Sequence, residues 1–323
     1  MAHRSSPIEP DLSDNDSTYP GSVDDASYTE SVTSSALKYR YENGRRYHSY
    51  HEGEYVLPND EQEQDRLDLS HHLYLMLLKG ELYQAPIKNP RRVLDLGTGT
   101  GIWAMDFADA HPDSEVVGID LSPIQPSWVP PNCRFEIDDF EQEWSYNHGF
   151  DYIHGRELEG CIRDHDQLFR RAFENLNPGG WLEMATIEVN TLSDDGTHLN
   201  VPCLLDVVKY VRIASKKFGK DMASVSTWKT RLETAGFTNV TENIMKLPQN
   251  PWPKDAKLKE LGRYHQLNLL EAMPPYTYAL FTRMLGWKRV QIETLLAGVR
   301  HELKDTSNHI YTKVYIVYGQ KPE

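Results

Sequence analysis

The chain has 323 residues, and its 48 Asp and Glu outnumber its 34 Lys and Arg, so the formal net charge at pH 7 is −14. Phosphate binding needs clustered Lys and Arg, so an acidic chain whose basic runs are short is not expected to bind nucleic acid. No run of about 18 apolar residues occurs, so we expect no transmembrane helix and no membrane partner. The first residues also lack the apolar core of a secretory signal.

Three cysteines, Cys133, Cys161 and Cys203, lie far apart and are odd in number. This pattern favours buried free thiols over a disulfide framework or a zinc ligand set, and it indicates a reducing compartment. We therefore expect a cytoplasmic protein, with the nucleus as the alternative, and no bound metal.

The N-terminal segment, residues 1–36, is rich in Ser, Asp, Thr, Pro and Gly and carries seven acidic residues against one basic residue. Such a composition cannot bury enough apolar surface to offset the entropy lost on ordering. We expect a disordered acidic tail, which serves either as a spacer or as a regulatory segment.

Residues 37–85 begin with closely spaced tyrosines and continue as a helix. Asn59 or Asp60 can cap this helix, and Gly80 marks its expected end. Spacings of three and four residues predict an apolar face, made of Leu67, Leu69, His72, Leu73, Met76 and Leu77.

From residue 86 to 323, apolar strand patterns alternate with helical ones. Strands are predicted near 91–96, 114–122, 133–140, 149–157, 181–189, 237–248 and 309–322. This order implies an α/β domain with a mostly parallel, Rossmann-like sheet and helices on both faces. The order of the strands cannot be read from the pattern.

Two helical insertions, at about 190–225 and 251–303, interrupt the alternation, and Pro274-Pro275 is expected to break the second. We expect the insertions to form an acceptor pocket. Their aromatic residues suit either that pocket or the core, and they are Trp252, Tyr276, Tyr278, Phe281 and Trp287.

The most specific motif is VLDLGTGTG, residues 93–101, in which a strand runs into alternating glycines before a helix. Glycines at 97, 99 and 101 permit positive φ and let a ligand approach the backbone. A dinucleotide fingerprint would require glycine at 102, where Ile102 stands. Asp120 ends the next strand, where a carboxylate can accept hydrogen bonds from both ribose hydroxyls.

The segment Asp95-Leu96-Gly97-Thr98-Gly99-Thr100-Gly101 resembles the first motif of class I S-adenosylmethionine-dependent methyltransferases. The resemblance implies a seven-stranded sheet whose last strand is antiparallel, with S-adenosyl-L-methionine as the cofactor. It further implies that Asp95 orients the methionine end and that Gly97, Thr98, Gly99 and Gly101 form the loop beside the cofactor.

The same resemblance assigns the adenosine end. Asp120 would hold the ribose, with Leu121 and Ser122 beside the adenine. Asp139 would accept from the adenine amino group, and the Phe140 N–H would face the ring, while Asp138 is a rival to Asp139 one residue away. His154 and Arg156 would lie where cofactor and acceptor meet.

Three segments, 45–72, 150–160 and 176–184, together with the glycine loop, resemble the LaeA-like methyltransferases of filamentous fungi. That group includes regulators of secondary metabolism and tailoring enzymes. The resemblance implies methyl transfer to a small-molecule acceptor, with a nuclear regulator acting through protein partners as the alternative. It also implies that Tyr47 and Tyr55 form a lid over the cofactor, although a packing role is equally consistent with them.

Methyl transfer needs a base only when the acceptor carries a proton that must leave. His154 and Glu157 are the candidates, with His265 as a weaker one; for His154 the alternative is a structural or cofactor-contact role. Arg156 could pair with Glu157 or Asp151, or bind an acidic acceptor. Tyr264-His265 could line the pocket or lie on a helix surface, His71-His72 suggests a helix-face pair, and Glu183 suggests a buried network.

Overall fold

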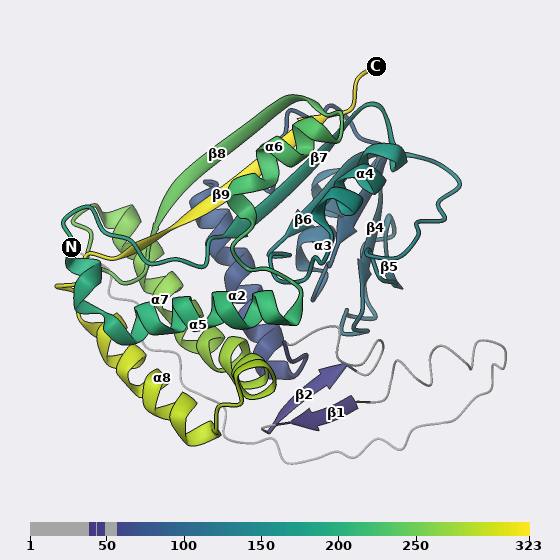
Figure 1. The fold of residues 1–323 in the computed structure, drawn as a ribbon. Helices are drawn as coiled ribbons and strands as arrows, with labels where there is room; N and C mark the ends of the chain where they lie inside the picture. The colour runs from purple at the N-terminus through teal and green to yellow at the C-terminus, as the bar shows by residue number, and fades with distance from the viewer. Residues whose placement is uncertain (1–38, 43, 49–56) are drawn as a thin grey trace, which may run out of the picture.

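The computed structural model describes residues 39–42, 44–48 and 57–323 (Figure 1). The expected disordered tail and Tyr55 lie outside these residues. Strands β1 (Tyr39–Glu42) and β2 (Arg45–His48) pair as an antiparallel hairpin, and α2 (Glu61–Leu77) follows.

A seven-stranded sheet forms the centre of the molecule, in the order β5-β4-β3-β6-β7-β9-β8. Its strands are β3 (Arg92–Leu96), β4 (Glu115–Asp120), β5 (Cys133–Ile137), β6 (Phe150–Arg156), β7 (Leu176–Ile187), β8 (Thr238–Pro248) and β9 (Tyr311–Gln320). Only β9 runs antiparallel to its neighbours within this sheet. The predicted mostly parallel sheet with an antiparallel closing strand is confirmed.

Helices cover both faces of the sheet, as Figure 1 shows. Since side chains alternate along a strand, Val93 and Leu94 face opposite layers. Val93 packs with Trp103 and Phe107 of α3 (Ile102–Ala110), whereas Leu94 packs with the cluster that contains α4 (His165–Asn175) and α6 (Trp228–Thr234). The central strands are therefore buried on both sides, which explains their almost continuous apolar sequences.

A separate helical layer lies at the carboxyl end of β7. It contains α5 (Pro202–Phe218), α7 (Ala256–Leu280), a π-helical turn (Phe281–Leu285) and α8 (Arg289–Lys304), which share one apolar cluster. The expected break at Pro274-Pro275 is wrong, because α7 continues through both prolines. Burial of Ala272, Pro275 and the residues that follow outweighs the helical hydrogen bonds that proline cannot make.

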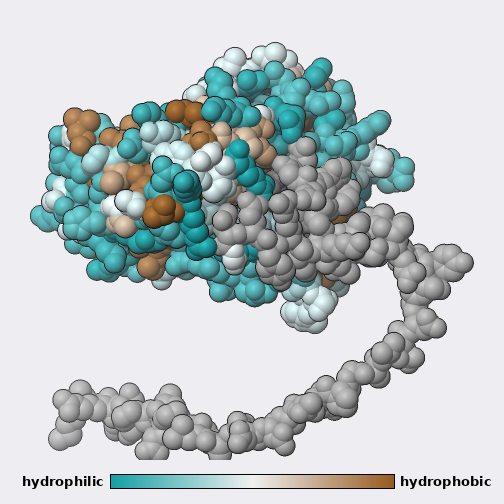
Figure 2. All heavy atoms as spheres, turned by 60° about the horizontal axis from the view of Figure 1, so that its bottom comes forward, coloured by the Kyte–Doolittle hydropathy of each residue, from teal (hydrophilic) through white to brown (hydrophobic). Residues whose placement is uncertain are grey.

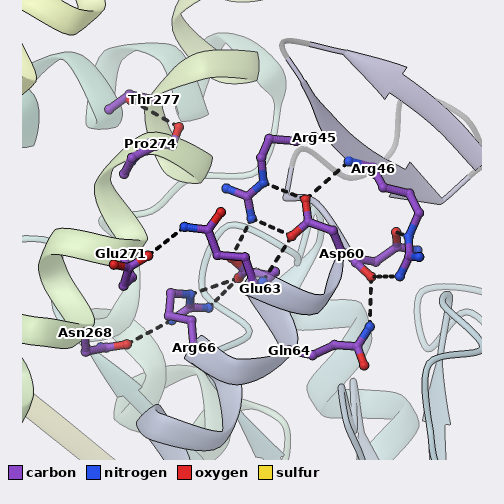
Figure 3. A network of polar contacts seen from close by, with 12 residues as sticks. Arg45, Arg46, Asp60, Glu63, Gln64, Arg66, Asn268, Glu271, Pro274 and Thr277 are labelled. Carbon is purple, nitrogen blue, oxygen red and sulfur yellow. Dashed lines mark hydrogen bonds and ion pairs between the residues drawn. The ribbon is translucent and has the colours of Figure 1, made fainter. Parts of the chain in front are cut away.

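The inner face of α2 differs from the predicted apolar stripe. Its buried residues are Glu63, Arg66, Ser70, His71, Leu73 and Tyr74, whereas His72 is exposed. Two of the polar members are paired, as Figure 3 shows: Arg66 donates to Glu63 of the same helix and to Asn268 of α7. Hydrophobic spacing missed this face because ion pairs and hydrogen bonds, rather than apolar contacts alone, hold it against α7.

Asp60 joins the hairpin to the start of α2. Its carboxylate accepts a hydrogen bond from the N–H of Glu63. It also accepts from Nε and Nη2 of Arg45, at 2.6 and 2.7 Å respectively. Burial opposes ionisation, but these hydrogen bonds outweigh it and lower the pKa of Asp60. The predicted helix start is confirmed, with Asp60 as the cap.

Apolar residues on the surface are dispersed. Among the residues that the structure describes, the exposed large ones are Trp128, Leu199, Ile213, Ile244, Leu258, Leu267 and Val290. The face in Figure 2 is mostly hydrophilic, with brown patches that are small and separate. Isolated apolar side chains of this kind are ordinary on a globular surface and do not indicate an interface.

Glu302 of α8 anchors the first turn of α5, and this anchor is testable. Its carboxylate accepts from the N–H groups of Cys203 and Leu204, at 2.9 and 2.8 Å. Replacement by alanine leaves two helix N–H groups without acceptors, so Glu302→Ala should lower the free energy of unfolding by about 2 to 3 kcal/mol. Urea denaturation measures this loss. Glu302→Gln keeps one acceptor oxygen and should lose about half as much; equal midpoints for all three proteins would refute the anchoring role.

Candidate functional site

The glycine loop leaves the end of β3 with three glycines in the left-handed region. Gly97 and Gly99 both have φ of +59°, and Gly101 has +82°. A Cβ on Gly101 would lie 2.3 Å from the ring of Phe135, so this glycine permits close packing on β5. A Cβ on Gly99 would meet nothing closer than Leu67, at 3.5 Å. Gly97 and Gly99 border an open cleft, whereas Gly101 lies behind it.

The cleft consists of two adjoining chambers with empty volumes of about 440 and 660 Å³, each including its opening to solvent. They share Leu67, Gly97, Gly99, Arg156 and Glu157. The carboxyl ends of β3, β4 and β6 meet here, as expected at the edge of a parallel sheet where ligands bind.

The first chamber contains Asp95 and His154. Asp95 accepts from the Thr98 hydroxyl at 2.6 Å and pairs with Nδ1 of His154 at 2.7 Å. His154 is buried and stacks on Trp103, with ring centroids 3.6 Å apart. Burial lowers the pKa of His154 in spite of the Asp95 carboxylate, so a neutral, fixed imidazole is favoured.

Arg156 borders both chambers, and α2 sets its orientation. Its Nη2 donates to Nδ1 of His71 at 3.0 Å, and the guanidinium lies over the Tyr74 ring, 4.9 Å from the centroid. Because Nδ1 of His71 accepts this bond, Nε2 carries the proton and donates to Asp106 at 2.9 Å. His71 is therefore buried between Arg156 and Asp106, to both of which it is hydrogen-bonded. Only His72 lies on the helix surface.

Glu157 and Asp151 were the two carboxylates proposed as partners of Arg156. Neither forms an ion pair with it among the contacts described. Asp151 accepts from the N–H groups of Arg91 and Arg92 instead. Glu183 accepts from the N–H groups of Gln84 and Ala85, in a buried network away from the cleft. Burial raises the pKa of Glu183 to about 7.

The second chamber contains Asp120, whose oxygens accept from the N–H groups of Gly99 and Ser122 at 2.9 and 2.8 Å. Burial raises the pKa of Asp120 to about 6, although these two bonds oppose the rise. Leu121, Asp139 and Phe140 also line this chamber.

Three other residues expected at the cofactor lie outside the lining. Asp138 accepts from the N–H of Asp139, and the hydroxyl of Ser122 accepts from Asn59. Tyr47 is buried within the helical layer, beside Arg283. The structure thus distinguishes Asp139 from its neighbour Asp138 by position.

Several lining residues were not predicted to belong to the cofactor site, among them Leu67, Ser70, Trp103, Leu158, Cys161 and Lys220. Leu67 and Ser70 lie one turn apart on α2, a spacing that places them on one face. Lys220 follows α5 and pairs with Glu141 at 2.7 Å. Only the tertiary fold brings these segments to the glycine loop.

A third cavity, with an empty volume of about 800 Å³ including its mouth, lies between the end of β7 and helices α5 and α7. Of the aromatic residues proposed for an acceptor pocket, Tyr276 lines it, whereas Trp252, Tyr278, Phe281 and Trp287 pack elsewhere. His265 is fully buried and lines the cavity, so a surface location for it is wrong. Tyr264 packs beside His72 instead.

Glu157 borders all three cavities. It follows β6 with a φ of +57°, a conformation that costs free energy in a residue other than glycine. Its N–H donates to the carbonyl of Ala185, and its Oε1 accepts from the N–H of Ile187 and from the Tyr74 hydroxyl. Burial raises the pKa of Glu157 in spite of these hydrogen bonds.

The cleft suits a hydroxylated nucleoside with a cationic tail. Asp120 and Asp139 offer acceptors to hydroxyl and amino groups in one chamber, and Asp95 and Glu157 place carboxylates in the other. Within the described ranges, no cluster of three or more His, Cys, Asp or Glu side chains is arranged to hold a metal ion. No helix of these ranges combines the length and apolarity that a membrane span needs.

Comparison with known proteins agrees with this geometry. A family model described as a methyltransferase domain matches residues 69–242, more than half of the chain. Methyltransferase pytC of Aspergillus terreus is 42% identical over 305 residues, which cover 93% of this chain and 94% of that protein. Secondary metabolism regulator LAE1 of Cochliobolus heterostrophus is 34% identical over 290 residues, 87% of this chain and 94% of that protein.

Secondary metabolism regulator laeA of Aspergillus fumigatus is 37% identical over 285 residues, which cover 87% of this chain and 76% of that protein. The match to the domain model and these near full-length likenesses agree with the glycine cleft at the ends of β3 and β4. The chain belongs to the methyltransferase domain family.

Proposed function

We propose that the chain is an S-adenosyl-L-methionine-dependent methyltransferase that acts on a small-molecule acceptor in fungal secondary metabolism. The observation that carries the proposal is that the acidic glycine cleft and the cavity between α5 and α7 meet at Glu157. The near full-length similarity to a fungal methyltransferase supports it.

The cofactor would occupy both chambers of the cleft. Asp95 and His154 would border its amino-acid end, Gly97 and Gly99 its middle, and Asp120 its ribose. When bound, it supplies a methyl group on a sulfonium, which is already activated for displacement. The protein therefore has to align the acceptor and exclude water, and alignment alone contributes up to roughly 7 to 11 kcal/mol of barrier lowering.

Glu157 and His154 take different roles in this proposal. The carboxylate of Glu157 lies at the boundary with the acceptor cavity, and its raised pKa suits it to receive a proton from an acceptor hydroxyl or amine. His154 is committed to Asp95 and Trp103, so it acts as a positioning residue for Asp95. Helix α2, which contributes Leu67 and Ser70 to the lining of the cleft, would serve as its lid.

A second candidate function is regulation through protein partners in the nucleus. The relatives named as secondary metabolism regulators favour it, because their similarity extends over 87% of this chain. Both functions would keep the cofactor cleft; only the first requires the cavity at Glu157 to receive a small molecule.

Label transfer separates the two candidates. The purified chain, incubated with methyl-labelled cofactor and a low-molecular-weight extract of a filamentous fungus, should place label in the small-molecule fraction. Glu157→Gln should lower the rate by roughly 100-fold if the carboxylate takes a proton, while cofactor affinity measured by calorimetry stays within a few-fold. Label found only in added nuclear proteins, or in neither fraction, would contradict the proposal.

Asp120 makes cofactor affinity depend on pH. Its pKa near 6 in the free protein means that below pH 6 the carboxyl is protonated, whereas ribose hydroxyls need the carboxylate as acceptor. Binding should therefore release a proton at acid pH, and affinity should fall by up to about tenfold per pH unit below 6 and stay level above about 7. Calorimetry from pH 5 to 8 measures this profile.

The control for Asp120 is the isosteric amide. Asp120→Asn should bind the cofactor roughly 10- to 100-fold more weakly and lose this acid-side dependence. An unchanged profile in the variant, with an intact thermal melt, would assign the pH dependence to another group.

Asp139 and Asp138 provide a matched pair, because they are adjacent and only Asp139 lines the second chamber. Asp139→Asn should weaken cofactor binding by about tenfold through loss of a charged acceptor, and Asp138→Asn should change it less than twofold. Equilibrium binding of labelled cofactor distinguishes them, and the reverse ranking would place the adenine contact on Asp138.

A further inference from the structure

The cavity between α5 and α7 contains polar atoms that the protein leaves unpaired. Among the described residues, five buried side-chain atoms without a hydrogen-bond partner belong to residues that line this one cavity. They are Oε2 of Glu159, Oε2 of Glu188, Oγ1 of Thr191, Oε1 of Gln249 and Nε2 of His265. Leaving a buried polar atom unpaired destabilises the folded state, and native proteins keep few such atoms. Their concentration around one cavity makes it a candidate ligand site.

His265, a lining residue of this cavity, has one ring nitrogen without a partner. Its Nδ1 lies 2.9 Å from the carbonyl oxygen of Pro248, which only accepts, so Nδ1 carries the proton. Burial lowers the pKa of His265 to about 4, which keeps the ring neutral at physiological pH. Nε2 is therefore an unoccupied acceptor.

Gln249 presents an acceptor by the same reasoning. Its Nε2 donates to the carbonyl oxygen of Asn190 at 3.3 Å, and Oε1 of the same amide group has no partner. Asn190 in turn donates to Oε1 of Glu188 at 3.2 Å. The groups of His265, Gln249 and Glu188 are thus connected through Pro248 and Asn190 into one polar wall.

The lining of the cavity is mainly acidic, although Oε1 of Glu188 also lies 3.7 Å from Nη2 of Arg212. Glu157, Glu159 and Glu188 line it, and Arg66 is the one basic residue among its described lining residues. Arg66 is already engaged, since it donates to Glu63 and Asn268 (Figure 3). Glu159 accepts from the N–H groups of Ser224 and Val225 through Oε1 alone, and burial raises its pKa to about 7. A positive charge nearby would favour its ionised form.

The rest of the lining is mainly apolar. It is formed mainly by α5 and α7 and includes Leu204, Val207, Val211, Met222, Leu269 and Met273. A ligand that fits both walls has an apolar body and a polar end. The unpaired polar atoms are acceptors, apart from the Thr191 hydroxyl, which can both donate and accept, and Oε2 of Glu159, which accepts when its carboxyl is ionised. A polar end that donates matches them.

We propose that this cavity recognises a small amphipathic amine, whose protonated amino group faces Glu159, Glu188, Gln249 and His265 while its apolar body packs on α5 and α7. An ammonium group offers three donors and a positive charge, which match the acceptors and the glutamates of this wall. A carboxylate or phosphate would add like charge and accept where donors are needed. The proposal rests on the proposed function, in which this cavity holds the methyl acceptor.

The test is calorimetry on the full chain saturated with S-adenosylhomocysteine, with three probes that share one apolar body. The probes are 4-phenylbutylamine, 4-phenylbutan-1-ol and 4-phenylbutyrate. The amine should bind at least about tenfold more tightly than the alcohol, and the carboxylate should bind most weakly. An amine that binds no more tightly than the alcohol, a preference for the carboxylate, or binding of none of the probes overturns the proposal.

Saturation with S-adenosylhomocysteine distinguishes failure of the amine proposal from failure of the proposed methyltransferase function. If S-adenosylhomocysteine itself does not bind, the proposed methyltransferase function fails. If it binds and the amine is not preferred, only the recognition of an amine fails.

Glu188→Gln tests whether the negative charge of Glu188 recognises the ammonium group. The substitution keeps the shape and removes the negative charge, so affinity for 4-phenylbutylamine should fall about tenfold while affinity for 4-phenylbutan-1-ol changes little. Equal losses for both probes would show a packing defect instead and would count against charge recognition.

Two buried threonines give a control that needs no ligand. The Thr191 hydroxyl is unpaired, whereas the Thr312 hydroxyl donates to the carbonyl of Glu188 at 2.6 Å. Thr312→Val should lower the melting temperature, and Thr191→Val should leave it unchanged or raise it, while weakening the amine several-fold. If Thr191→Val destabilises the free protein as much as Thr312→Val does, the cavity wall is not unsatisfied and the proposal fails.

Discussion

The site depends on one backbone position, Glu157, immediately after the central strand β6. Because β6 lies between β3 and β7 in the sheet, the residue that follows it reaches both the glycine loop and the end of β7. The left-handed backbone at Glu157 is fixed by hydrogen bonds to Ala185 and Ile187 of β7. Strain at a residue other than glycine persists only where the surroundings hold it, and here it places one carboxylate on three cavities.

Helix α2 completes the site from the other side. It supplies Leu67 and Ser70 to the cleft, Arg66 to the third cavity, and His71 and Tyr74 to the positioning of Arg156 and Glu157. The inner face of the helix is therefore polar, and its stability comes from pairs such as Arg66 with Glu63 and Asn268. Removing one partner of such a buried pair costs much more free energy of unfolding than the intact pair contributes. These pairs therefore fix the position of the helix more than they stabilise the fold.

The sequence predicts best what local spacing determines. The glycines after β3, and the acids Asp95 and Asp120 at strand ends, follow from the chain order of strand, loop and helix, and the seven-stranded sheet follows from the same order. The register of a single residue does not: Asp138 and Asp139 are equivalent in pattern, and only the turn after β5 directs one of them to the cleft.

Contacts between distant segments could not be predicted. His71 meets Arg156 across 85 positions, and Arg66 meets Asn268 across 202, so no periodicity reports either pair. For His265, a helical pattern does not say which face α7 turns to β8, and the carbonyl of Pro248 decides it. The helix break predicted from the prolines of α7 was wrong for the converse reason. Their local preference for a break is weaker than the stabilisation that burial gives the helix around them.

The two ligand regions differ in how their polar groups are satisfied. In the cleft, Asp95 and Asp120 already accept hydrogen bonds from Thr98, Gly99 and Ser122, so the loop is organised before a cofactor arrives. In the third cavity, His265 and Gln249 keep acceptors unpaired. Preorganised groups bind with little reordering, whereas unpaired ones lower the stability of the free protein and regain it only with a complementary partner. If the third cavity holds the acceptor, as proposed, the cleft serves one constant ligand, and the specificity of the protein resides in the groups of the cavity that it leaves unpaired.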